Sequence, residues 1–109
     1  MLGVLTACVA AGAAGFTSLA ITDTGLDFTN RIPAERYLTN QIPLNGGGVA
    51  LGDLDGDGRT DVFFSGTAGS SALFRNLGGW RFERVTAAAF PGGLNFDATG
   101  CAVADLDGD

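Results

Sequence analysis

A nine-residue acidic stretch constrains the fold of this chain more than any other feature. It reads Asp53-Leu54-Asp55-Gly56-Asp57-Gly58-Arg59-Thr60-Asp61, with carboxylates at relative positions 1, 3, 5 and 9. Two like charges about 4 Å apart repel by roughly 4 kcal/mol at an effective dielectric constant of about 20, so the crowded carboxylates need a cation or protons. The two glycines permit the tight turn that brings the side chains together. We therefore interpret the stretch as a loop that binds one calcium ion, rather than as a solvated acidic turn.

The order of residues in the loop predicts the ligands. We expect side-chain oxygens from the four aspartates, the backbone carbonyl at position 7, and water to complete a coordination number of 6 to 8. The predicted metal-site residues are Asp53, Asp55, Asp57, Arg59 and Asp61. The nearest rival is an EF-hand, but its loop ends in a glutamate at position 12, where this chain has Phe64. Magnesium fits less well, because it prefers few protein ligands in a strict octahedron.

Outside this loop the charge is nearly balanced. Of twelve acidic residues, four lie in the loop and three begin a second acidic segment (Asp105, Asp107 and Asp109); of the six arginines one lies in the loop, which leaves five acids against five arginines elsewhere. The net charge of -6 therefore belongs to the two acidic segments, and the scattered arginines form no basic stripe for nucleic acid. The chain has no histidine, the commonest general base, and its clustered carboxylates are assigned to the cation. We expect no enzyme activity from these residues.

The first twenty residues carry no charge and are rich in alanine and glycine. We interpret residues 1–15 as a signal peptide; its basic leader is missing, so either the true start lies upstream or the signal is weak. An alternative is a lipoprotein signal, in which Cys8 of the box Leu5-Thr6-Ala7-Cys8 would carry a lipid anchor, the one membrane attachment we expect. Both interpretations predict a secreted, periplasmic or cell-surface protein. Cys101, in an apolar run, reads as a small buried hydrophobic residue.

Short strands separated by turn signals are predicted in the second half of the chain. We expect strands at 49–51, 62–64, 72–75 and 80–86, joined by the acidic loop, a loose loop at 66–71 and a tight turn at 76–79. In the last strand Trp80, Phe82 and Val85 are interspersed with the charged residues Arg81, Glu83 and Arg84.

The region before these strands is less regular. Residues 16–26 read as a short edge strand with a turn at 23–25. Residues 27–44 read as a loop insertion, because Pro33 and Pro43 flank its polar middle; a helical turn over 34–38 is the alternative.

An internal repeat predicts the architecture. Gly48–Asp57 recurs at Gly100–Asp109, displaced by 52 residues, and a period near 50 indicates units that cannot bury their faces alone. Four short antiparallel strands per unit are typical of a β-propeller blade. We therefore predict an all-β fold with an N-terminal edge strand and loop at 16–46, a blade at 47–99 and the start of a second, truncated blade at 100–109. The propeller is incomplete, and an isolated blade with two unpaired edges is expected to fold poorly.

These motifs carry a family resemblance. Gly48–Phe64 followed by Leu73–Thr86 resembles an FG-GAP or VCBS repeat, the unit of integrin-α-like calcium-binding propellers. The phrases Arg75–Gly79 and Phe82–Thr86, with Thr24–Phe28, are similar to exported bacterial proteins of the ASPIC/UnbV and cartilage-acidic-protein type. The resemblance implies an adhesion or extracellular binding module with calcium and a protein or glycan partner. An alternative is a part of a secreted propeller lyase or hydrolase whose active site lies in other blades.

Overall fold

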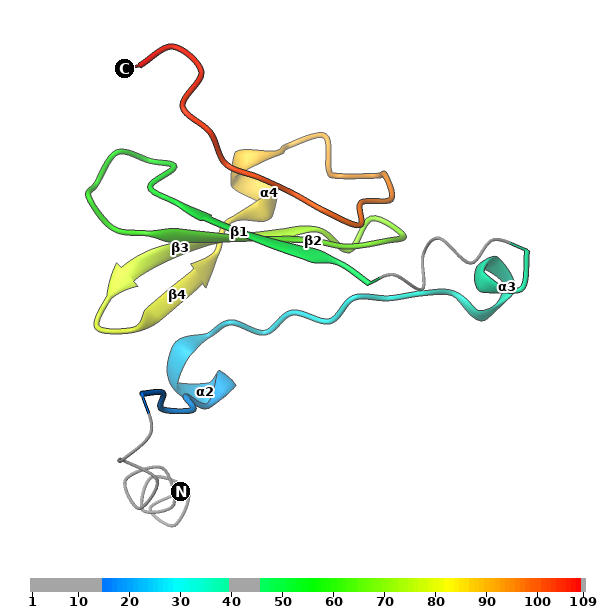
Figure 1. The fold of residues 1–109 in the computed structure, drawn as a ribbon, viewed down its shortest axis with the longest axis horizontal. Helices are drawn as coiled ribbons and strands as arrows, with labels where there is room; N and C mark the ends of the chain where they lie inside the picture. Colours follow the sequence, from blue (N-terminus) through cyan, green and yellow to red (C-terminus); the bar gives the residue numbers. More distant parts are fainter. Residues whose placement is uncertain (1–14, 40–45, 109) are drawn as a thin grey trace.

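The computed structural model describes residues 15–39 and 46–108, and it is centred on one antiparallel sheet with strand order β1-β2-β3-β4 (Figure 1). In chain order the elements are α2 (Ile21–Thr24), α3 (Ala34–Tyr37), β1 (Gly48–Gly52), β2 (Asp61–Ser65), β3 (Ala72–Gly78), β4 (Arg81–Arg84) and α4 (Thr86–Ala89). The prediction of an all-β blade with four short antiparallel strands is confirmed. The signal prediction falls, except for Gly15, outside the described residues, as does Cys8. Among the described residues, no helix has the length and apolar character needed to cross a membrane.

The sheet is a meander in which each strand pairs with the next along the chain. Val62 pairs with Leu51 on one side and with Phe74 on the other, while Phe63 pairs with Ala50. Directly paired residues of antiparallel strands share a face of the sheet. We call the face with Val62 face A and the face with Phe63 face B.

The hydrophobic core lies on face A and is small. Phe74 is 1% exposed and Val62 is 7% exposed, and the ring of Phe64 meets that of Phe74 edge-on with centroids 5.8 Å apart. The segment before the sheet adds Phe28, whose ring stacks on Phe64 at 4.7 Å. One face of one short sheet thus supplies most of the buried apolar contact of the described residues.

The second copy of the β1 sequence covers face B. In Figure 1 it is the orange-red trace that crosses the sheet. A Cβ atom added to Gly48 would lie 2.9 Å from Gly100 Cα, and one added to Gly52 would lie 2.7 Å from Val103 Cγ1. Nearly equivalent residues of the two copies therefore run side by side in the same direction, and glycine in β1 permits the approach. Cys101, in the second copy, is half-buried, and this copy forms no strand.

The predicted edge strand before the sheet is wrong. Residues 16–20 lie outside any strand, and α2 follows them. The Thr24 hydroxyl donates to the carbonyl of Ala20 (3.2 Å), and the N–H of Gly25, at φ 76°, donates to the carbonyl of Ile21 (2.7 Å). A helical turn satisfies these backbone groups locally, whereas a strand would need a neighbour.

The connection between β3 and β4 also differs from the prediction. β3 continues to Gly78, with an irregular register after Asn76, whose side-chain oxygen accepts the N–H of Gly78 (2.8 Å). The reversal therefore falls at Gly79 and Trp80. Trp80 lies in this turn at φ 62° and is 72% exposed, so its predicted place in the fourth strand is wrong. β4 ends before Val85, which precedes α4.

Polar contacts hold α3 and the segment before it against the β2–β3 loop and against Asp97, which follows α4. In the predicted loop insertion at 27–44, the structure adopts the alternative of a helical turn, which is α3. Residues 40–45 lie outside the described residues. Arg36 forms a two-pronged ion pair with Asp97, which also accepts the N–H of Ala68 (2.7 Å). The Asn30 side chain accepts the N–H of Thr67 (2.8 Å). The hydrogen bond from Arg36, followed by that from Ala68, lowers the pKa of Asp97 below its ordinary value.

Phe74→Ala is expected to destabilise the fold strongly. Removing a buried phenylalanine ring costs about 3–5 kcal/mol, a large fraction of the stability of a small domain. Trp80→Ala is the matched control, since this ring is exposed and its loss should change stability by less than about 0.5 kcal/mol. Thermal or urea unfolding followed by circular dichroism measures both. Equal losses of stability from the two substitutions would show that Phe74 is not part of the hydrophobic core.

Asp97→Asn is expected to make the fold less sensitive to acid. The charged form of Asp97 stabilises the fold above the ordinary aspartate pKa of about 3.9, because the folded pKa is lowered, and this stabilisation is lost as the pH falls through the folded value. The melting temperature of the wild type should therefore fall more steeply than that of the variant between about pH 5 and pH 2. Asp23→Asn, which takes no part in the ion pair of Arg36 with Asp97, should keep the wild-type slope. Identical slopes for the wild type and Asp97→Asn would contradict the claim that charged Asp97 stabilises the fold.

Candidate metal centre

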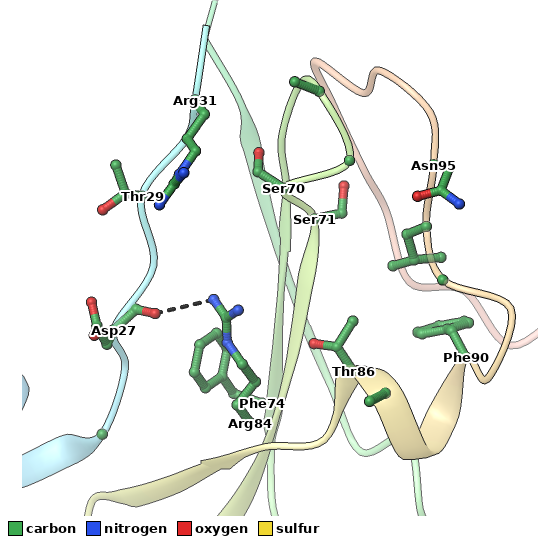
Figure 2. A pocket seen from close by; sticks show the side chains of 16 residues that line it. Asp27, Thr29, Arg31, Ser70, Ser71, Phe74, Arg84, Thr86, Phe90 and Asn95 are labelled. Atoms are coloured by element: carbon green, nitrogen blue, oxygen red, sulfur yellow. Dashed lines mark hydrogen bonds between the residues drawn. The ribbon is translucent and has the colours of Figure 1, made fainter.

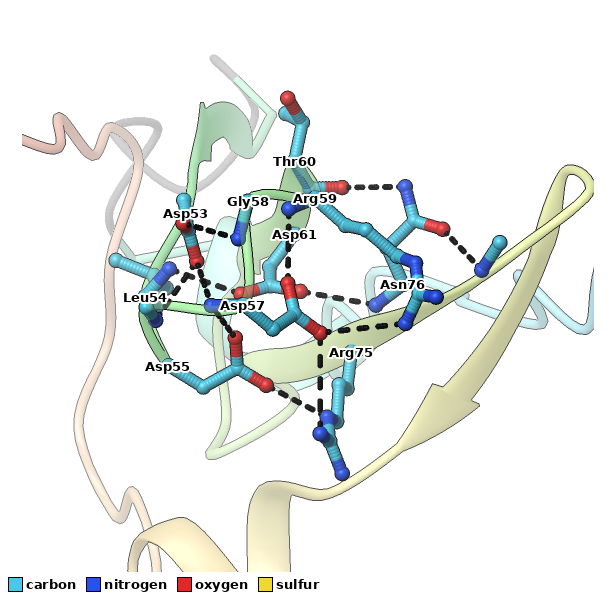
Figure 3. Close-up of polar contacts among 12 residues, drawn as sticks. Asp53, Leu54, Asp55, Asp57, Gly58, Arg59, Thr60, Asp61, Arg75 and Asn76 are labelled. Carbon is cyan, nitrogen blue, oxygen red and sulfur yellow. Dashed lines mark hydrogen bonds and ion pairs between the residues drawn. The ribbon is translucent and has the colours of Figure 1, made fainter.

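The acidic loop connects β1 to β2 at one end of the sheet (Figure 3). Residues 53–59 follow a series of bends with no regular secondary structure. Gly56 and Gly58 have φ values of 78° and 83°, a conformation that residues with a Cβ rarely adopt. These two glycines turn the chain back on itself, so that its alternate side chains face one another.

Three of the four predicted carboxylates come together. One oxygen each from Asp53, Asp55 and Asp61 lies within 4.8 Å of the others. Asp61 is the first residue of β2 and is only 2% exposed, whereas Asp53 and Asp55 are exposed. The cluster is therefore anchored in the sheet at Asp61 and open to solvent at the loop.

Backbone N–H groups hold all three of these carboxylates in place, and Asp55 accepts from the N–H of Asp57 (3.1 Å). Asp53 accepts from Gly56 (2.8 Å) and Asp57 (3.2 Å) with one oxygen and from Gly58 (2.8 Å) with the other. Asp61 accepts from the N–H of Leu54 (2.9 Å). An ionised carboxylate offers about four acceptor positions, so both side chains retain capacity for a cation.

Asp57 and Arg59 occupy different positions from these three carboxylates. Asp57 is not one of the three clustered carboxylates; it accepts the N–H of Arg59 (2.8 Å) with one oxygen. Its other oxygen lies 3.6 Å from Nη1 of Arg59 and 3.8 Å from Nη2 of Arg75. In this structure Asp57 is paired with arginines. Metal ligation by Asp57 and by the Arg59 carbonyl stays a prediction.

Two residues of β3 complete the site and were not predicted as part of it. Nε of Arg75 lies 2.6 Å from an oxygen of Asp55. Asn76 donates its backbone N–H to Asp61 (2.9 Å) and its side-chain amide to the carbonyl of Thr60 (2.9 Å). The sequence predicts Arg75 at the end of the strand next to β2 and Asn76 directly after it, and this adjacency is the signal that could have found them. Arg75 and Asn76 therefore connect the acidic loop and the start of β2 to β3.

These contacts set the ionisation of Asp55. Removal of water from the carboxyl group acts to raise its pKa, but hydrogen bonds from the N–H of Asp57 and from Arg75 outweigh this effect. The pKa of Asp55 is therefore lowered from its ordinary value. A carboxylate that stays charged in a cluster of like charges is suited to a divalent cation. The clustered donors are all hard oxygen atoms, which is the chemistry that calcium prefers.

A separate pocket of about 900 Å³ lies between the segment before the sheet, the β2–β3 loop and α4 (Figure 2). The guanidinium of Arg84 lies 5.3 Å from the centre of the Phe74 ring and donates to the carbonyl of Asp27 (3.2 Å). The hydroxyl of Ser70 donates to a carbonyl of its own loop (2.6 Å), and that of Thr86 accepts an N–H of β3 (3.0 Å). These polar groups of the pocket hold the surrounding loops in place.

A four-stranded antiparallel blade with an acidic loop between its first two strands defines a repeat unit of the β-propeller type. The sequence model of the FG-GAP-like repeat matches residues 53–109, which is more than half of the chain, and the chain belongs to this family. Repeats of this family often bind calcium and are usually found in extracellular or surface proteins. Comparison with curated proteins and with solved structures gives no significant match.

Arg75→Gln is expected to loosen the metal-free loop. The substitution removes the ion pair with Asp55 and leaves the aspartates without their nearest cation from β3. Because the pair is partly exposed, we expect a fall in melting temperature of roughly a few degrees. Arg81→Gln, on the neighbouring strand and outside the loop contacts, is the control and should melt like the wild type. A loss no greater than that of the control would show that Arg75 does not hold the loop.

Proposed function

We propose that this chain is part of an exported, calcium-stabilised β-propeller of the VCBS and ASPIC/UnbV type, which binds an extracellular protein or glycan and serves adhesion. The observation that supports the proposal best is the cluster of Asp53, Asp55 and Asp61 within 4.8 Å, in a chain that belongs to the FG-GAP-like repeat family. The predicted ligands are these three carboxylates, Asp57 and the carbonyl of Arg59.

Calcium would act as a structural ion in this proposal. Asp61 begins β2 and accepts a hydrogen bond from β3, and Asp53 directly follows β1, so a bound ion would tie the ends of three strands together. It would also remove the repulsion among the carboxylates. Extracellular calcium modules bind at roughly 10⁻⁴ to 10⁻³ M, which suits a compartment where calcium is plentiful.

Binding, rather than catalysis, is the activity we propose. Catalysis by nucleophilic attack needs a hydroxyl or thiol next to a base. The hydroxyls of Ser70 and Thr86 in the 900 Å³ pocket are engaged by backbone groups, and the chain has no histidine to serve as base. We propose no role in nucleic-acid binding and a membrane attachment only through a lipid on Cys8.

Calcium is expected to raise the melting temperature of the full chain. At a free calcium concentration about 100 times the dissociation constant, the folded state gains roughly 2.7 kcal/mol, and a chelator removes this gain. Asp61→Asn should lose the response, whereas Asp23→Asn, an exposed aspartate on α2, should keep it. Differential scanning calorimetry with calcium, magnesium or chelator measures the effect.

Two results would count against the proposal. If calcium and chelator gave the same melting temperature, the ion would have no structural role in this chain. If Asp61→Asn responded to calcium like the wild type, the ion would bind outside the acidic loop.

A further inference from the structure

The cavity of about 900 Å³ in Figure 2 falls in the size range of ~300–1,000 Å³ that is typical of ligand pockets. None of the residues that line it belongs to the acidic loop. Its charged lining residues are Asp27, Arg31 and Arg84. In a chain of net charge -6, a cavity lined by two arginines and one aspartate is an exception. Its charge favours a negatively charged ligand.

The two arginines of this cavity have no anionic partner. Three other arginines of the chain each pair with an aspartate, but within residues 15–39 and 46–108 neither Arg31 nor Arg84 forms an ion pair. Asp27 meets Arg84 through its backbone carbonyl (3.2 Å) rather than through its carboxylate. Figure 2 shows the side chains of both arginines in the space between the segment before the sheet and the β2–β3 loop. Two cations that face one cavity repel each other, and an anion between them removes this repulsion.

Arg84 is held in place by contacts that leave most of its donors available. Its guanidinium lies 5.3 Å from the centre of the Phe74 ring, and Nη2 donates to the carbonyl of Asp27. A guanidinium has five N–H donors in a rigid plane, a geometry that matches the oxygens of a carboxylate. Because the side chain is already ordered, binding an anion costs little conformational entropy.

Arg31 reaches the cavity from a fixed stretch of backbone. Its carbonyl accepts the hydroxyl of Thr67 (2.5 Å), and the side chain of the preceding Asn30 accepts the N–H of Thr67 (2.8 Å). Thr67 itself is only 1% exposed, so this attachment point is buried. The guanidinium of Arg31 makes no hydrogen bond within the part of the chain that the structure describes. Its backbone is therefore anchored while all its side-chain donors remain available.

The remaining walls of the cavity offer groups that fit the hydroxyls and the ring of a sugar. The hydroxyl of Ser70 donates to the carbonyl of Thr67 (2.6 Å), so its oxygen can still accept a hydrogen bond. The side-chain amide of Asn95, which has no hydrogen bond to another described residue, can both donate and accept. Phe90 is half-buried and adds an aromatic ring. Inorganic phosphate would fill only a small part of the cavity and leave these groups unused.

We propose that this cavity binds a sugar unit of an acidic glycan, and that Arg31 and Arg84 hold the carboxylate or sulfate group of that unit. The hydroxyls of the sugar meet Ser70 and Asn95, and the apolar face of its ring packs on Phe90. This inference rests on the proposed binding of an extracellular glycan and specifies the class of glycan. The glycan and the calcium ion occupy separate sites, because the cavity and the acidic loop share no residue.

Microscale thermophoresis of the full chain in calcium buffer, with matched oligosaccharides as probes, measures the binding. Trigalacturonate carries carboxylates, sulfated maltotriose carries sulfates, and maltotriose is neutral. We expect at least one acidic probe to bind, more weakly as the salt concentration rises, and maltotriose not to bind. The acidic probe that binds more tightly identifies the anionic group.

Three results would overturn the proposal. Equal binding of maltotriose and the acidic probes would do so but leave glycan binding in place. Tighter binding of polyglutamate than of either acidic trisaccharide would indicate an acidic protein as the partner. Absence of binding by every probe, in a chain that calcium still stabilises, would remove the glycan partner and keep the calcium-dependent propeller.

Arg31→Gln is the variant that tests the location of the site, because the guanidinium has no hydrogen bond to lose within the described chain. We expect it to weaken binding of the acidic trisaccharide about tenfold and to leave the melting temperature unchanged. Arg81→Gln removes the same charge from β4 outside the cavity and should bind like the wild type.

Asn95→Ala provides a second, independent variant on another wall of the cavity, and it covers the case in which Arg31→Gln does not fold. It should weaken binding several-fold, because a hydrogen bond to the sugar is lost. Wild-type affinity in both Arg31→Gln and Asn95→Ala would overturn the proposal. An equal loss of affinity in Arg31→Gln and Arg81→Gln would also overturn it, since the attraction would then be one of overall charge.

Discussion

Repulsion among four aspartates in a nine-residue loop is the constraint on which the rest of the structure depends. The loop lies between β1 and β2, and its hydrogen bonds and ion pairs reach β3 through Arg75 and Asn76. The side chains that must be neutralised are therefore the same ones that connect three strands. Asp61 shows this most clearly, because it is the first residue of a strand, nearly fully buried, and a member of the carboxylate cluster. In a site of this kind, the charge of the loop affects the stability of the whole blade.

The second constraint is the size of the blade. Four short strands bury only Val62, Ala72 and Phe74 as a hydrophobic cluster among the described residues. The two faces are then covered by chain from outside the sheet, with Phe28 on face A and the second copy of the β1 sequence on face B. This is the behaviour of repeat proteins, in which a unit gains much of its stability from its neighbours. The clamp of Arg36 on Asp97 adds a polar contact between the same outer segments and the blade.

The sequence predicted the blade, its four short antiparallel strands and the position of the acidic loop, because alternation, turn residues and the repeat are local signals. It did not predict α2 or the exposure of Trp80. A strand at 16–26 depends on a neighbouring strand that this sheet does not offer, and the bulge after Asn76 moves Trp80 from the strand into the turn. The contribution of Arg75 to the loop also escaped the sequence analysis, because it comes from a residue fourteen positions beyond Asp61 that only strand pairing brings near. Contacts between strands decided each of these differences.

Isothermal titration of the full chain with calcium tests the central claim most directly. The account predicts saturable heat with one ion per complete loop and a dissociation constant of roughly 10⁻⁴ to 10⁻³ M. The same titration of Asp61→Asn should give only the heat of dilution. Absence of saturable heat in the wild type at concentrations well above about 1 mM, with the chain folded, would contradict the claim that the aspartate loop is built around a divalent ion.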